Sequence, residues 1–123
     1  MKIVHTTAAQ GDVLFRRVTL PKGALKKLEE RFEGQARKVV AHSETGHHHV
    51  IDDAGVRMYQ GEDPFVAYLL LESTDHADVV HRRDFDTHGT LRLSGKPGTV
   101  WEARRPREHV PWSGSTLGQM LED

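Results

Sequence analysis

Apolar and polar residues alternate over short segments along most of this chain, and glycine, proline or aspartate separates the segments. Alternation with a period of two places the apolar side chains on one face of an extended strand. Residues 65–71 form a continuous apolar run, which predicts a central strand buried on both faces. The whole pattern predicts about eight short strands, at residues 13–18, 38–42, 47–51, 56–60, 65–71, 77–82, 90–93 and 99–104.

Residues typical of turns predict how these strands connect. Residues 52–55 read Asp-Asp-Ala-Gly and predict a hairpin between the strands on either side of them. Residues 95–98, Gly-Lys-Pro-Gly, predict a tight turn from which the last strand leads back. One segment has a different period: Leu25, Leu28 and Phe32 recur at helical spacing, so residues 23–33 are expected to form a short helix.

Many short strands separated by turn residues are typical of an all-β protein, here a small barrel or sandwich with one short helix. A length of 123 residues corresponds to one domain that can bury an independent core. We therefore expect a single β-rich domain over residues 1–123, with an extended C-terminal tail from about residue 106.

The composition excludes several classes of function. Lys and Arg number 17 and Asp and Glu 18, so the chain lacks the strong positive charge typical of nucleic-acid-binding domains. The absence of cysteine excludes disulfides, thiol catalysis and cysteine-ligated metals, and it fits a reducing cytoplasm. No signal peptide is expected, and the longest apolar run is too short to cross a membrane.

The candidate chemistry lies in the histidines, four of which fall within residues 42–49. His47 and His49 are two positions apart, so on a strand their rings share a face, while His48 faces the other way. Gly46 directly before them allows another backbone or a ligand to approach closely. Histidines on solvated strand ends, without any bound ligand, are the alternative interpretation of this segment.

A second cluster contains His81 and His88, with several aspartates between and beside them. If the strand of His49 pairs with the strand of His81, three or four imidazoles come together. Such a set suits a divalent transition metal, namely zinc, iron, manganese or nickel. The aspartates could act as ligands or could orient the rings. The predicted metal ligands are His47, His49, His81 and His88.

Five segments carry a resemblance to known proteins: residues 10–14 (Gln-Gly-Asp-Val-Leu), 20–24 (Leu-Pro-Lys-Gly-Ala), 40–49 with their histidine triplet, the later histidine-containing stretch 81–88, and 97–100 (Pro-Gly-Thr-Val). They resemble a group of small uncharacterised bacterial and bacteriophage proteins with a Gly-Glu-x-Thr-Gly-His-x-His segment. The His-x-His pair is also similar to the first motif of cupins, although Glu62 follows it later than the cupin glutamate does. The resemblance implies a shared β fold and a shared histidine site.

Together these observations predict a histidine-rich β domain that binds a divalent metal and has a structural or accessory role. The resemblance implies no known activity, but a role in a bacteriophage particle fits it, so the expected location is the cytoplasm or the virion. The expected partners are further copies of the chain or a larger assembly, with no membrane and no nucleic acid. The alternative is a cupin-like metalloenzyme that acts on a small molecule, which would require an open metal position inside a pocket.

Overall fold

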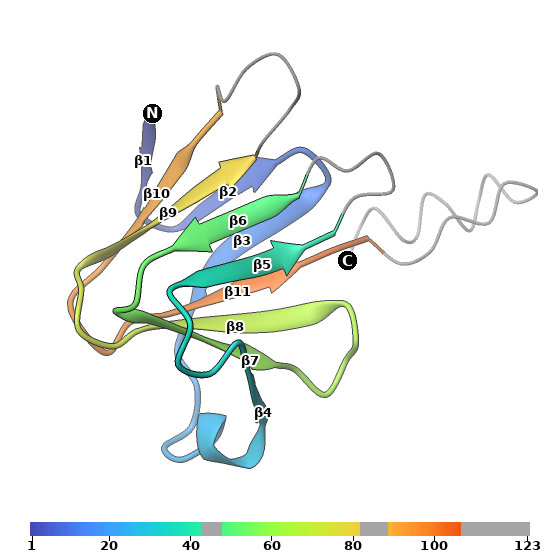
Figure 1. Cartoon of the computed structure of the whole chain (residues 1–123), viewed down its shortest axis with the longest axis vertical. Helices are drawn as coiled ribbons and strands as arrows, with labels where there is room; N and C mark the ends of the chain where they lie inside the picture. Colours follow the sequence, from blue (N-terminus) through green and yellow to red (C-terminus); the bar gives the residue numbers. More distant parts are fainter. Residues whose placement is uncertain (43–47, 82–88, 107–123) are drawn as a thin grey trace, which may run out of the picture.

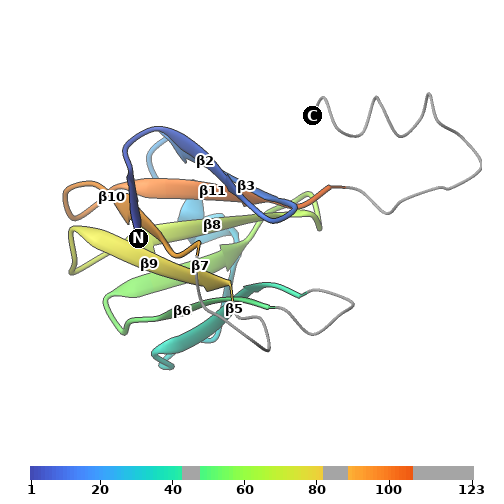
Figure 2. The same cartoon turned by 90° about the horizontal axis from the view of Figure 1, so that it is seen from above.

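The computed structural model describes residues 1–42, 48–81 and 89–106 of the chain. In these residues eleven strands form two sheets that pack face to face, which confirms the all-β prediction and gives a sandwich (Figures 1 and 2). The predicted C-terminal tail lies mostly outside the described residues. The described part contains no helix that is long and apolar enough to cross a membrane.

The first sheet has five strands, and its outermost strand β1 runs parallel to its neighbour β10. The remaining pairs in this sheet are antiparallel. In spatial order the strands are β1 (Lys2–Val4), β10 (Leu91–Ser94), β9 (His76–His81), β6 (His49–Asp52) and β5 (Arg37–Ala41).

The second sheet has six strands, all antiparallel to their neighbours. Two of its strands, β2 and β4, were not expected from the alternation pattern. In spatial order the strands are β2 (Thr7–Gln10), β3 (Val13–Val18), β11 (Val100–Arg104), β8 (Val66–Leu71), β7 (Val56–Gln60) and β4 (Glu29–Arg31).

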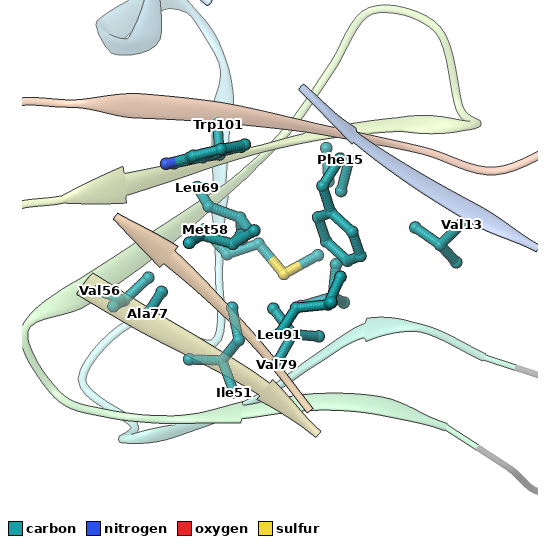
Figure 3. Packing of buried hydrophobic residues seen from close by; sticks show 14 of the residues in the cluster. Val13, Phe15, Ile51, Val56, Met58, Leu69, Ala77, Val79, Leu91 and Trp101 are labelled. Atoms are coloured by element: carbon teal, nitrogen blue, oxygen red, sulfur yellow. The ribbon is translucent and has the colours of Figure 1, made fainter. Parts of the chain in front are cut away.

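The core lies between the two sheets and contains side chains from both. Trp101, Phe15 and Leu69 project from the six-stranded sheet, and Ile51 and Val79 project from the five-stranded sheet toward them (Figure 3). These side chains are fully buried, so each contributes roughly 1.5–3 kcal/mol of transfer free energy relative to exposure. The apolar face predicted for each strand is therefore the face that closes the sandwich.

The hairpin predicted around residues 52–55 is wrong. The turn exists, and the Asp53 side chain accepts a hydrogen bond from the Gly55 amide at 2.7 Å. However, β6 before it belongs to the five-stranded sheet and β7 after it to the six-stranded sheet. The turn at residues 95–98 likewise joins β10 of one sheet to β11 of the other. These turns form corners of the sandwich, and the consecutive strands on either side of each turn contribute apolar side chains to the core from opposite layers.

The helix predicted over residues 23–33 is also wrong, apart from one short 3-10 turn at Leu25–Lys27. Residues Glu29–Arg31 instead form β4, which pairs with Met58–Gln60 at the edge of the six-stranded sheet. Phe32 then adopts a positive φ of 58° and packs against the core. The sheet edge offers backbone partners to this segment, and that tertiary contact outweighs its modest helical preference.

Strand β8 is central in its sheet, as predicted, but its two faces differ. Ala67, Leu69 and Leu71 face the core and are buried. On the outer face Val66 is buried, whereas Tyr68 and Leu70 are only half-buried. Leu70 forms part of an open groove of 740 Å³ between the sheet and the segment at residues 19–26. The segment at residues 19–26 therefore covers the outer face of β8 only in part.

Lys38 on β5 is a buried cation that the alternation pattern did not single out. Its side chain is 2% exposed, and its ammonium group donates to the carbonyl oxygens of Gln35, Ala36 and Asp53 at 2.9–3.0 Å. Burial lowers the pKa of Lys38, and the negative charge of Asp53 opposes that shift. The ammonium group thus ties the start of β5 to the turn after β6.

Replacing Lys38 by methionine is expected to lower the free energy of unfolding by about 2 kcal/mol, because three carbonyl oxygens lose a charged donor. Chemical denaturation of the variant measures this loss. Lys22→Met, at an exposed position, is the matched control and should change stability by less than about 0.5 kcal/mol. Equal effects at the two positions would contradict the proposed role of Lys38.

Candidate metal site

Three structural elements meet at one end of the sandwich: the start of β6, the end of β9 and the turn between β2 and β3 (Figures 1 and 2). In the pairing of β6 with β9, His49 stands directly opposite His81. This confirms the strand pairing that the sequence suggested. Gly11, in the β2–β3 turn, packs against the edges of both rings, since a Cβ atom there would lie 2.9 Å from His81 Cε1 and 3.4 Å from His49 Cε1.

The Gly11 position requires glycine for two reasons. Its φ of 59° lies in the left-handed region, which a residue with a side chain rarely adopts. In addition, a methyl group would displace the His81 ring. The glycine thereby lets the turn of one sheet close over two histidines of the other.

His49 is the central residue of the site, and its side chain is 1% exposed. Its Nδ1 lies 2.8 Å from the side-chain oxygen Oε1 of Gln10, the last residue of β2. The Gln10 amide nitrogen Nε2 donates to the carbonyl oxygens of Val79, at 2.8 Å, and Gly89, at 2.6 Å. The Nδ1 edge of the buried imidazole is thus held by a residue from the opposite sheet.

The other ring nitrogen of His49, Nε2, is buried and has no hydrogen-bond partner among the described residues. A carboxylate oxygen, Asp12 Oδ1, is 3.7 Å away, which is beyond hydrogen-bond distance. Asp12 lies at the surface, with its side chain 71% exposed. Burial, reinforced by the neighbouring His81, lowers the pKa of His49 to about 4, although Asp12 opposes the shift. The ring is therefore neutral at pH 7.

His81 stacks on His49, with ring centroids 4.1 Å apart and planes inclined by 13°. The lone pair of an imidazole nitrogen lies in the ring plane, so two parallel rings direct their lone pairs side by side. Joint binding of one ion would require the His81 ring to turn. Consistent with this, the described residues contain no cluster of three or more histidine, aspartate or glutamate residues arranged to hold a metal.

The remaining predicted ligands, His47 and His88, lie outside the described residues. His48, which was expected to face away from the site, contacts the ring of His42 edge to face, with centroids 4.9 Å apart. The structure thus brings together His49 and His81 of the predicted set.

Gln10 and Asp12 were not predicted as site residues. The sequence pointed to Gln10-Gly11-Asp12 only as part of the resemblance at residues 10–14. A buried glutamine at the end of a strand gives no recognisable pattern in the amino-acid sequence. Its role depends on the packing of one sheet against the other.

A family model for a Domain of unknown function (DUF8820) matches residues 9–106 of the chain. The chain belongs to this family. The matched region includes Gln10, Asp12, His49 and His81, so the candidate site lies entirely within the family domain. No curated protein and no solved structure matches the chain significantly.

Proposed function

We propose that this domain binds a divalent transition metal ion through His49 Nε2 and the carboxylate of Asp12. The observation that carries the proposal is the buried Nε2, which has no hydrogen-bond partner among the described residues and faces a carboxylate oxygen at 3.7 Å. At neutral pH this nitrogen presents a lone pair, because Nδ1 lies against an oxygen acceptor and must carry the proton. A lone pair and a carboxylate repel each other unless a cation or a hydrogen-bond donor such as water lies between them.

The separation fits a bridging metal ion. Metal–nitrogen and metal–oxygen bonds of roughly 2.0–2.2 Å place the two donor atoms about 3.3 Å apart at a tetrahedral angle and about 4.2 Å apart when collinear. The observed 3.7 Å lies within this range. The hydrogen bond from Nδ1 to Gln10 is the kind of outer contact that orients a metal-binding histidine. Zinc, iron, manganese and nickel all accept such nitrogen and oxygen donors.

Two protein ligands leave coordination positions to be filled. His81 lies beside His49 and would supply a third donor after rotation of its ring. His47 and His88 remain proposed ligands on the basis of sequence: His47 is two residues before His49 and His88 is seven residues after His81. A metal held in this way would join the β2–β3 turn of one sheet to β6 of the other.

This arrangement supports a structural role, in which the ion would link the two sheets at one end of the sandwich. Assembly with further copies of the chain and a place in a bacteriophage particle remain proposals that rest on the sequence resemblance. A cupin-like metalloenzyme is the alternative. Thermal melts with and without chelator, combined with sizing chromatography, separate the two functions. Any ion that binds only the folded state raises the melting temperature by mass action. Chelation of a structural ion should therefore lower the melting temperature strongly or change the oligomeric size, whereas removal of a catalytic ion from a preformed pocket should cost little stability and leave the size unchanged.

The direct test is a calorimetric titration of untagged, chelator-treated protein with zinc, iron(II), manganese and nickel. Asp12→Asn removes one proposed ligand at an exposed position, so the fold should be preserved. We expect its metal affinity to be weaker by roughly 10-fold or more. Asp75→Asn is the matched control, because Asp75 is equally exposed and also contacts a histidine, His76, at 2.7 Å.

His49→Gln should abolish high-affinity binding at this site, and His76→Gln should leave it unchanged. Circular dichroism of each variant establishes that the fold is retained. Failure of the wild-type protein to bind any of the four metals would overturn the proposal, as would equal affinities for the Asp12 and Asp75 variants.

A further inference from the structure

We infer that Gln10 is a positioning residue that selects which nitrogen of His49 is available to a ligand. The inference rests on the proposed function, since it concerns the same site. Its structural basis, however, is independent of any metal. Gln10 is buried and belongs to β2 of the six-stranded sheet, whereas His49 belongs to β6 of the five-stranded sheet.

The orientation of the Gln10 amide is fixed by two backbone carbonyl oxygens. A carbonyl oxygen only accepts hydrogen bonds, so the end of the amide that faces Val79 and Gly89 must be the NH₂ group. Both hydrogens of that group are then used, at 2.8 and 2.6 Å. The reversed amide would set an oxygen against two carbonyl oxygens. The side-chain oxygen of Gln10 is thereby directed at His49.

That oxygen determines the tautomer of the imidazole. A neutral histidine carries one ring proton, and the amide oxygen 2.8 Å from Nδ1 can only accept a hydrogen bond. Nδ1 therefore holds the proton, and Nε2 holds the lone pair that faces Asp12. In a histidine without such a partner both tautomers are populated, and part of the population would direct an N–H group at the ligand.

Gln10 also connects His49 to backbone groups elsewhere in the five-stranded sheet. Its two acceptors lie in β9, at Val79, and directly before β10, at Gly89. Together with its contact to His49, the side chain thus joins β2 to β6, to β9 and to the segment that leads into β10. Coordination at Nε2 makes the Nδ1 proton more acidic and strengthens its hydrogen bond to Gln10, since linked hydrogen bonds polarise one another. Neutral glutamine also adds no charge to the site.

The test compares Gln10→Leu with Gln10→Glu by nitrogen-15 NMR of histidine-labelled, metal-free protein at neutral pH. Protonated and unprotonated ring nitrogens differ strongly in chemical shift, so the spectrum reports the tautomer of His49 directly. We expect wild-type His49 to be protonated at Nδ1. Leucine should give a mixture of tautomers, and glutamate, which still offers an acceptor oxygen, should retain the Nδ1 proton.

Metal affinity should follow the tautomer: weaker by roughly 10-fold or more for Gln10→Leu, and near the wild-type value for Gln10→Glu. A purely structural role predicts instead that affinity falls with stability, and glutamate, which cannot donate to two carbonyl oxygens, also costs stability. Gln60→Leu is the matched control, since Gln60 lies in the same sheet and likewise donates to a backbone carbonyl, that of Val66, at 3.1 Å.

The possible failures are distinguishable. An unprotonated Nδ1 in the wild-type protein, or the same tautomer in the wild type and Gln10→Leu, would overturn the role of Gln10. Normal metal affinity in a Gln10→Leu protein with mixed tautomers would do the same. A wild-type protein that binds no metal but shows the expected change in tautomer would overturn the proposed function while the assignment of Gln10 stands.

Discussion

Replacing Leu69 by alanine is expected to lower the free energy of unfolding by roughly 2–5 kcal/mol, the largest effect of a single substitution that we predict. Leu69 is 0% exposed and lies on the central strand β8. Its cross-strand neighbours Trp101 and Met58 point with it into the core (Figure 3). Alanine would remove the buried side chain from a place where rigid strands on both sides prevent the core from closing over the cavity.

Leu70→Ala is the matched control, because it makes the same chemical change on the next residue of the same strand. Leu70 is half-buried in the open groove on the outer face, so its replacement should cost about 1 kcal/mol or less. Urea denaturation of the two variants measures the difference. Equal losses would mean that the outer face of β8 is as well covered as the core.

Acidification of the metal-free protein is expected to reduce its stability by an amount on the order of 3 kcal/mol between neutral pH and about pH 4. His49 has its pKa lowered to about 4 in the folded protein, whereas in the unfolded chain it titrates at the ordinary value near 6.5. Between these values the unfolded chain binds the proton and the folded protein does not. Stability therefore falls as the pH decreases through this interval and reaches its full value above it.

Denaturation curves at a series of pH values, recorded with chelator present, measure this dependence. The chelator removes the separate effect of pH on metal binding. His49→Gln should flatten the dependence in this interval. A dependence that persists in full in His49→Gln would show that another group is responsible.

The local pattern of apolar and polar residues was sufficient to predict most of the strands. The alternation of apolar and polar residues located the strands around Phe15, Ile51, Val79, Leu93 and Trp101, and a continuous apolar run located the strand around Leu69. This is possible because the period of a strand is a local property of the backbone. The continuous apolar run at residues 65–71 likewise indicated a central strand. It did not indicate that only one face of that strand would be fully covered.

The connections between strands could not be predicted in the same way. A turn such as residues 52–55 has the same sequence signature whether it joins neighbours in one sheet or forms a corner between two sheets. The choice depends on which partner buries the apolar face. The same reason explains residues 29–31, where the edge of β7 converts a weak helical pattern into β4. It also explains Lys38, whose three carbonyl partners are assembled only by the fold.

At the candidate site the sequence by itself was enough to predict that His49 and His81 take part. It also predicted that they would come together if their strands paired. Only the tertiary structure decided what surrounds them. Gln10 and Asp12 reach His49 from the opposite sheet, across 39 and 37 positions of the chain, and Gly11 between them lets the turn approach. Spacing along the chain carries no information about such contacts, because they depend on how two sheets are stacked. The sequence supplied the imidazoles, and the packing of the sandwich buried one of them, set its tautomer and placed a carboxylate before its free nitrogen.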